Sequence, residues 1–190
     1  MTKIYLVHGW GGNPTSEGWF GWLIYECRER NIELTIPEMP NTDYPRIEEW
    51  IGKLKKVVDI ETNNDIYLIG HSIGCQAIMR YLEKLPRDKK IKGLIFIAGW
   101  FNLIDSCLIN EKEREIAKPW LEIPIDTKKV KKHAEKIIAI FSADDHCVPV
   151  SDAELFKKRL MARIIIKEDE GHFNESQQIK EIIDFIENVN

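Results

Sequence analysis

Closely spaced cysteines are missing from this sequence, and with them the usual pattern of a zinc site. The four cysteines (Cys27, Cys75, Cys107 and Cys147) lie 48, 32 and 40 residues apart, so the chain has neither a CxxC pair nor a Cys/His cluster. We therefore expect no metal site and no cofactor. The four side chains are predicted to be buried or half-buried thiols rather than disulfides, which is consistent with a reducing compartment.

Long apolar runs and an excess of positive charge are also missing. The longest apolar stretch, Leu94 to Phe101, is too short to span a bilayer, and residues 1–7 lack the apolar core of a cleavable signal. Lys and Arg number 27 against 31 Asp and Glu, a net charge of −4 that gives no general attraction to phosphate backbones or anionic lipid. We predict a cytoplasmic protein that acts on a small molecule, with no nucleic-acid or membrane partner.

What the sequence does contain is a regular alternation of strand and helix patterns. Its 190 residues suit a single domain spanning 1–190, with no linker, repeat or low-complexity tract. Because apolar strands that alternate with helices are buried on both faces, the pattern predicts a three-layer α/β fold with a mostly parallel sheet of about six strands. The expected strands are Lys3–Val7, Ile32–Ile36, Ile66–Ile69, Gly93–Ala98, Ile137–Phe141 and Arg163–Lys167.

Three helical patterns are also clear. Apolar residues recur at helical spacing from Ile47 to Val58, with Trp50 expected in the core, and again from Ile179 to Val189. Ser151 and Glu154 have the spacing of a capping box at the start of a third helix. By contrast, nearly forty residues separate the fourth and fifth expected strands. We therefore expect residues 100–132 to take one of two forms. They are either a small lid or rim over a site, or an ordinary crossover connection lengthened by extra helices.

The chemistry centres on Gly70-His71-Ser72-Ile73-Gly74, which matches G-x-S-x-G. The motif follows an expected strand and precedes an apolar helical stripe, which is the context of a nucleophile elbow. In such a turn the serine has a strained backbone, and the two glycines remove side chains that would crowd it. The pattern predicts Ser72 as a nucleophile with its Oγ at a helix N-terminus.

A serine hydroxyl needs a base that is oriented by an acid, and in this arrangement the acid and then the histidine follow in chain order. The fifth expected strand is followed by Asp144-Asp145, and the sixth by His172. Four other histidines are interpreted differently. His8 and His71 are expected to be structural, His133 to be solvated within a lysine-rich run, and His146 to lie at the rim beside the acid.

In their joint order these motifs resemble the α/β-hydrolase superfamily, and within it the small serine hydrolases typified by retinoblastoma-binding protein nine. The resemblance runs nearly end to end, from His8-Gly9-Trp10-Gly11-Gly12 to Gly171-His172-Phe173. It implies a trimmed hydrolase sheet and a Ser–Asp–His triad. Because the acid in such loops stands four residues before the proline of a D-x-x-V/I-P pattern, alignment on Pro149 favours Asp145, with Asp144 as the reserve. The oxyanion hole is expected from the backbone N–H groups of Ile73 and Trp10, with Gly11 as an alternative to Trp10.

Substrate preference is the least constrained prediction. Trp10, Trp100, Phe101 and Trp120 lie near loops that could face the site, and Gly99–Leu108 contains no Arg or Lys. We expect small or medium uncharged carboxylic esters, unless these aromatic side chains simply pack the insertion onto the sheet. A peptidase or thioesterase with the same triad, and a protein-binding module on a hydrolase scaffold, stay open as alternatives, although the L-x-C-x-E peptide that would indicate such a protein partner is absent.

Overall fold

The computed structural model describes residues 1–60 and 65–188, and its centre is one parallel sheet. All six predicted strands are present, and their order across the sheet is β2-β1-β3-β4-β5-β6, with every neighbouring pair parallel. Parallel strands place their carboxyl ends at one edge, where ligands of open α/β sheets bind. The strands are β1 (Thr2–Val7), β2 (Glu33–Thr35), β3 (Asp65–His71), β4 (Ile91–Ile97), β5 (Ala134–Ser142) and β6 (Arg163–Lys167).

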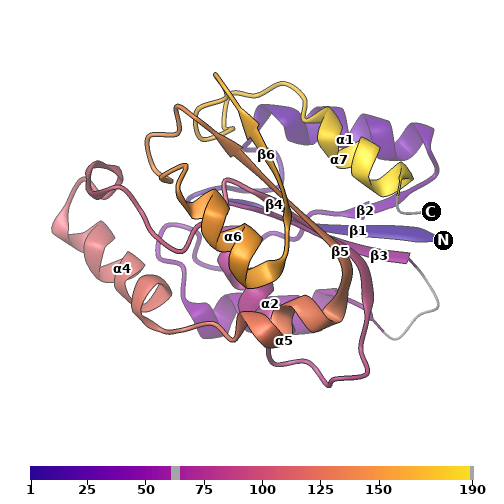
Figure 1. The fold of residues 1–190 in the computed structure, drawn as a ribbon, viewed down its shortest axis with the longest axis horizontal. Coiled ribbons are helices and arrows are strands. Elements are labelled where there is room, and N and C mark those ends of the chain that lie inside the picture. Colours follow the sequence, from indigo (N-terminus) through magenta and orange to yellow (C-terminus); the bar gives the residue numbers. More distant parts are fainter. Residues whose placement is uncertain (61–64, 189–190) are drawn as a thin grey trace.

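Helices cover both faces of this sheet (Figure 1). Helices α1 (Gly18–Glu29) and α7 (Lys180–Glu187) pack on one face, where their apolar side chains join those of β1, β3, β4 and β5. The opposite face carries α2 (Ile47–Val57), α3 (Ile73–Leu82), α5 (Thr127–His133) and α6 (Asp152–Leu160), and Trp50 is fully buried in this layer. The predicted three-layer α/β architecture with a parallel sheet of six strands is therefore confirmed. Val189, the last position of the predicted C-terminal stripe, lies outside the described residues.

The interval between β4 and β5 contains a short 3₁₀ turn, η1 (Asp105–Cys107), then α4 (Glu111–Glu122), then α5. Helix α4 and the loop before it project from the body of the molecule (Figure 1). Arg80 of α3 fixes the end of α4, because its guanidinium donates to the carbonyl oxygens of Trp120 and Ile123 at 2.9 and 2.7 Å. Trp120 is 1% exposed, and its indole N–H donates to the carbonyl of Pro45.

The predicted capping box at Ser151 is wrong. The backbone is already helical at Ser151, with φ −61° and ψ −20°, and its side chain makes no capping hydrogen bond. The N–H groups of Asp152 and Ala153 instead donate to the carbonyls of Pro149 and Val150. Since the preceding turn satisfies these donors, the helix start needs no hydroxyl acceptor.

His133 is buried, so the prediction of a solvated side chain is also wrong. It is 3% exposed at the end of α5, and its Nδ1 lies 2.8 Å from the carbonyl oxygen of Lys89. The lysine-rich run around it lies on the outer face of the helix, whereas Val130 and His133 lie one turn apart on the inner face. Within residues 1–60 and 65–188, no helix has the length and apolar character needed to cross a bilayer.

The expectation of four free thiols is wrong for two of the cysteines. Cys107, in η1, and Cys147, in the loop after β5, form a disulfide with a Cα–Cα distance of 4.8 Å. Cys27 and Cys75 are free and buried, as expected. The pairing was not visible in the sequence because 40 residues separate the partners and only the folded insertion brings them together. A second link joins the same segments, since the N–H of Ile104 donates to the carbonyl of Cys147 at 2.8 Å.

Candidate active site

Ser72 lies in the sharp turn between β3 and α3. Its backbone has φ 53° and ψ −121°, a conformation that L-residues rarely adopt, and its N–H donates to the carbonyl of Ile97 on β4. A side chain at Gly74 would lie 2.2 Å from the carbonyl oxygen of Val7, and one at Gly70 would lie 2.7 Å from the backbone of Cys75. The two glycines of G-x-S-x-G therefore allow the backbones of β1, β3 and α3 to approach closely around Ser72.

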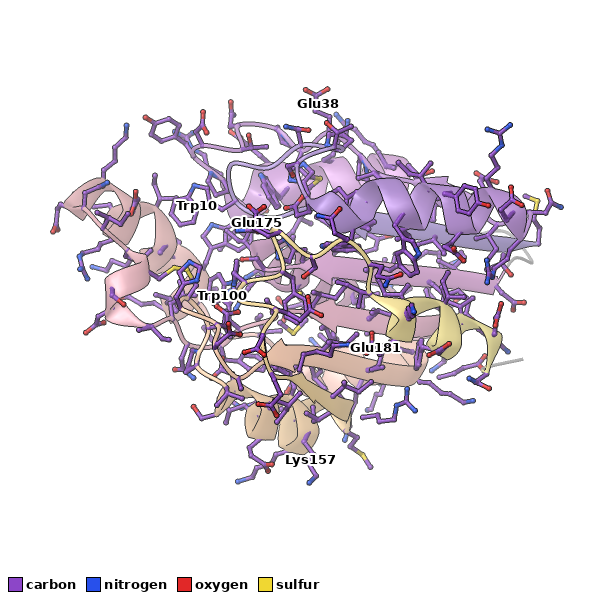
Figure 2. The ribbon with its side chains drawn as sticks, turned by 90° about the horizontal axis from the view of Figure 1, so that it is seen from above. Trp10, Glu38, Trp100, Lys157, Glu175 and Glu181 are labelled. Carbon is purple, nitrogen blue, oxygen red and sulfur yellow. A yellow bond between two sulfur atoms is a disulfide. The ribbon has the colours of Figure 1, made fainter. Side chains whose placement is uncertain are left out.

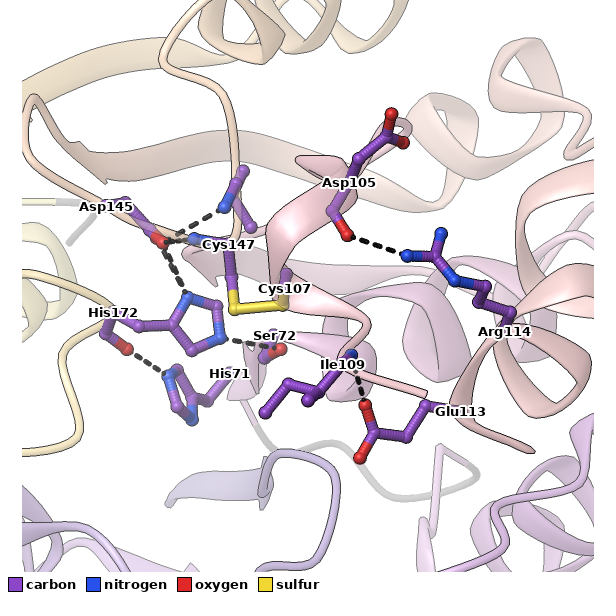
Figure 3. The surroundings of a disulfide bond; sticks show 11 residues. His71, Ser72, Asp105, Cys107, Ile109, Glu113, Arg114, Asp145, Cys147 and His172 are labelled. Carbon is purple, nitrogen blue, oxygen red and sulfur yellow. Dashed lines mark hydrogen bonds and ion pairs between the residues drawn. A yellow bond between two sulfur atoms is a disulfide. The ribbon is translucent and has the colours of Figure 1, made fainter. Parts of the chain in front are cut away.

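The loops after β5 and β6 bring Asp145 and His172 to this turn (Figure 3). Nε2 of His172 lies 2.9 Å from Oγ of Ser72, and Nδ1 lies 2.8 and 3.0 Å from the two carboxylate oxygens of Asp145. Asp145 also accepts the N–H groups of Cys147 and Val148, so its carboxylate is held in place by its own loop. The three side chains form a continuous chain of hydrogen bonds.

Asp144 has a different environment from its neighbour. Its side chain is exposed, and Oδ1 accepts hydrogen bonds from the hydroxyl of Ser142 and the backbone N–H of Gly171. These bonds hold the pKa of Asp144 below its ordinary value. Asp144 therefore connects the acid loop to the histidine loop, while Asp145 contacts the imidazole of His172.

Burial lowers the pKa of His172 below its ordinary value of 6.5, because desolvation disfavours the charged imidazolium. The hydrogen bond with Asp145 opposes this effect, and His71 and His146 add to it. Because the net effect is a pKa below the ordinary value, the imidazole of His172 is neutral near pH 7 and can accept a proton at Nε2.

Two backbone N–H groups beside Ser72 are free to bind an oxygen atom. Among the described residues, no hydrogen bond engages the N–H of Trp10, after β1, or of Ile73, the first residue of α3. The N–H of Gly11, by contrast, donates to the carbonyl of Thr42 at 2.9 Å. Trp10 and Ile73 are therefore better placed than Gly11 to act as oxyanion donors.

A pocket of about 270 Å³ opens over Ser72 and His172. Viewed from above, Trp10, Trp100 and Glu175 lie at the same end of the sheet, close to the disulfide (Figure 2). The insertion contributes much of the wall, and the described lining residues include Glu17 and Glu113 but neither Lys nor Arg. Six lining residues come from the insertion at 100–132: Trp100, Leu103, Cys107, Leu108, Ile109 and Glu113.

The four aromatic residues singled out in the sequence divide into two groups. Trp10 and Trp100 line the pocket. Trp120 packs edge-on against Trp50 in the core, and Phe101 packs against Phe156 of α6. For Trp120 and Phe101 the second alternative holds, because these two side chains pack the insertion onto the body of the domain.

Sequence reasoning missed three groups that shape the site. One is the disulfide, whose two cysteines both line the pocket. Another is Asp152, which is 1% exposed and accepts the N–H groups of Phe101 and Asn102 at the start of the insertion. The third is the buried pair Glu17 and His71 beneath His172. A polar side chain at the start of a helix is usually exposed, so nothing in the sequence indicated that Asp152 and Glu17 are buried. In the part of the chain that the structure describes, no cluster of His, Cys, Asp and Glu could hold a metal ion.

Residues 4–184 match the family model described as serine hydrolase. The chain belongs to the serine hydrolase family. Among curated proteins, this serine hydrolase is 29% identical to YdeN of Bacillus subtilis and 27% identical to the serine hydrolase RBBP9 of Rattus norvegicus. Each match extends over 178 residues, which is 93% of this chain and 89% of the relative. The family predicted from the motifs is thus confirmed, and the chain is an enzyme of the serine hydrolase type.

Solved structures agree with this assignment. The crystal structure of the Bacillus subtilis YdeN product superposes with a TM-score of 0.86 at 25% identity, covering 100% of this serine hydrolase and 98% of that chain. Est1E from Butyrivibrio proteoclasticus superposes with a TM-score of 0.71 at 17% identity, covering 99% and 88% of the two chains. At that identity the likeness to Est1E establishes the shared fold alone.

Proposed function

We propose that this serine hydrolase cleaves small or medium uncharged carboxylic esters through Ser72, His172 and Asp145. The observation that carries the proposal is the 2.9 Å separation of Ser72 Oγ and His172 Nε2 at the base of the pocket. This distance lies within hydrogen-bond reach, as proton transfer from the hydroxyl to the imidazole requires.

The proposed reaction has two halves. Ser72 Oγ attacks the ester carbonyl carbon while His172 Nε2 takes the hydroxyl proton, and the N–H groups of Trp10 and Ile73 stabilise the resulting oxyanion. Collapse of this tetrahedral intermediate breaks the bond to the alcohol, which leaves with the proton from His172. Water then attacks the acyl-enzyme by the same route, and the acid product and free Ser72 are released. Asp145 holds the imidazole in the required tautomer throughout.

The lining of the pocket supports uncharged substrates. Glu17 and Glu113 contribute carboxylates, and no cationic side chain is found among the described lining residues to clamp an anionic acyl group. Trp10, Trp100 and Leu103 supply apolar area for a short acyl or aryl group.

We further propose that residues 103–113 of the insertion form a rim over the pocket, while Phe101 and Trp120 attach the insertion to the core. Ile109 supports this assignment, because it lines the pocket although it is 83% exposed.

The cytoplasmic location stays a prediction of the sequence. The disulfide between Cys107 and Cys147 favours a less reducing environment than that prediction assumed.

The decisive experiment is labelling with a serine-reactive fluorophosphonate probe. The wild-type protein should be labelled and should hydrolyse p-nitrophenyl acetate, and Ser72→Ala should lose the label and at least about 10⁴-fold in turnover. Wild-type protein without label would indicate a binding module on a hydrolase scaffold.

A p-nitrophenyl series from acetate to palmitate, run beside amide and thioester analogues, tests the substrate class. Activity that rises steadily towards palmitate, or that is confined to amides or thioesters, would contradict the ester preference.

A further inference from the structure

A second buried histidine lies directly beside His172. His71, which precedes Ser72 in the elbow, is 1% exposed, and its ring centroid lies 5.2 Å from that of His172. Its Nε2 lies 2.8 Å from the backbone carbonyl oxygen of His172, and its Nδ1 lies 3.1 Å from a carboxylate oxygen of Glu17. Figure 3 shows the contact between His71 and the carbonyl of His172. Both ring nitrogens of His71 therefore face oxygen acceptors.

The partners of His71 determine its protonation. A carbonyl oxygen only accepts, so Nε2 must carry a proton, and a neutral imidazole would then present a lone pair at Nδ1 to the carboxylate. Burial raises the pKa of Glu17, but hydrogen bonds from His71 and Ser16 and the nearby charge of His71 outweigh it, so that pKa lies below the ordinary value. The hydroxyl of Ser16 donates to one carboxylate oxygen of Glu17, and the other oxygen faces Nδ1 of His71 at 3.1 Å, so a proton on Nδ1 would complete the hydrogen bonding of this carboxylate.

We propose that Glu17 and His71 form a buried ion pair that positions His172 and keeps its imidazole unprotonated, an inference that rests on the function proposed above for His172. The hydrogen bond from Nε2 of His71 fixes the peptide of His172 in a loop where Phe173 has φ 62°. The positive charge of His71, one ring away, opposes a second positive charge on His172. Neither residue touches the reacting atoms, so both are positioning residues.

Other titratable groups face this cluster and must be considered. His8 lies near Glu17 and His71, but burial lowers the pKa of His8, which makes it neutral. His172 faces Asp145, whose charge has the opposite effect, and His146, whose ring centroid is 6.1 Å away. His146 is exposed, so solvent screens its charge more than that of His71. Asp169, Glu170 and Glu175 line the outer surface beside His172.

The test is the pH dependence of kcat/KM for p-nitrophenyl acetate in His71→Gln and Glu17→Gln. The first variant removes the charge but keeps an amide donor near the carbonyl of His172. The second removes the carboxylate, so that His71 can be neutral. The acid limb of this profile is the fall in kcat/KM at low pH as His172 becomes protonated. In both variants the limb should move to higher pH by roughly 0.5 to 1 unit, as expected for unit charges about 5 Å apart in a partly solvated site. Glu175→Gln, an exposed change on the same loop as His172, should leave the limb in place or move it slightly to lower pH.

A limb that stays fixed or moves to lower pH in either variant overturns the proposal. Imidazole ¹⁵N chemical shifts of wild-type His71 provide a readout that needs no variant and no catalysis: both nitrogens should be protonated across the pH range of the limb, and a single protonated nitrogen would contradict the ion pair. Failure of the proposed function has a different signature, namely wild-type protein that is no more reactive than Ser72→Ala. Thermal unfolding of each variant verifies that it is folded before its profile is compared.

Discussion

The Oδ1 atom of Asp144 accepts a 2.9 Å hydrogen bond from the backbone N–H of Gly171. This bond joins the loop after β5 to the loop after β6, one residue away from the contact between Asp145 and His172. The two adjacent aspartates therefore have different contacts: Asp144 links the two loops, and Asp145 holds the imidazole of His172. Their variants should differ accordingly.

We expect Asp145→Asn to lower kcat by about 10³–10⁴-fold, because an amide no longer favours the tautomer with a proton on Nδ1 of His172. Asp144→Asn should change kcat by only a few fold, since the amide oxygen can still accept from Ser142 and Gly171. Ester hydrolysis by the two purified variants distinguishes them. Reversed phenotypes would identify Asp144 as the acid.

Gly74→Ala should destabilise the fold strongly and remove activity. The added methyl group would lie 2.2 Å from the carbonyl oxygen of Val7, a backbone atom that cannot rotate away. We expect a loss of about 3 kcal/mol or more in the free energy of unfolding, measured by urea denaturation. Gly52→Ala in α2 is the matched control, because its methyl group would meet nothing within 4 Å and should raise stability by roughly 0.5–1 kcal/mol. Equal effects of the two substitutions would be inconsistent with the close approach of β1 and α3.

Ile109→Ser should weaken binding of aryl esters without affecting the chemical step. The side chain of Ile109 lines the pocket, and loss of its apolar area should raise KM by about 5- to 10-fold with kcat little changed. Ile123→Ser is the control, since Ile123 directly follows α4 in the same insertion, is 50% exposed and is absent from the described pocket lining. An unchanged KM for Ile109→Ser would show that residues 103–113 do not act as a rim.

The fold and the hydrogen-bonded side chains at the elbow could be predicted from the sequence because each depends on local pattern. Apolar strands, the glycines around Ser72 and the position of His172 after the last strand are all visible within a few residues. The disulfide, the pair Glu17 and His71, and the burial of His133 could not be predicted in this way. Each depends on contacts between residues 40 or more positions apart, which only the folded chain brings together.

Replacing both Cys107 and Cys147 by Ala should lower the free energy of unfolding by about 2–4 kcal/mol, because the crosslink closes a long loop in the unfolded chain. The melting temperature of the wild-type protein should also fall in dithiothreitol, whereas that of the double variant should not respond. Cys27→Ala is the control, since Cys27 is a free, buried thiol and its removal should leave the response to dithiothreitol intact. A wild-type melting temperature that is insensitive to dithiothreitol would argue that the bridge contributes little.

The same crosslink determines what a protease could do to this protein. Helix α4 carries many exposed side chains and lies between the two bridged cysteines, so a single cut there opens the backbone without separating the pieces. The nicked protein would run as one band on a non-reducing gel and as two bands after reduction. Ser72 would lie on one fragment, with Asp145 and His172 on the other, and the sulfur–sulfur bond would be the only covalent link between Ser72 and the histidine proposed to act as its base.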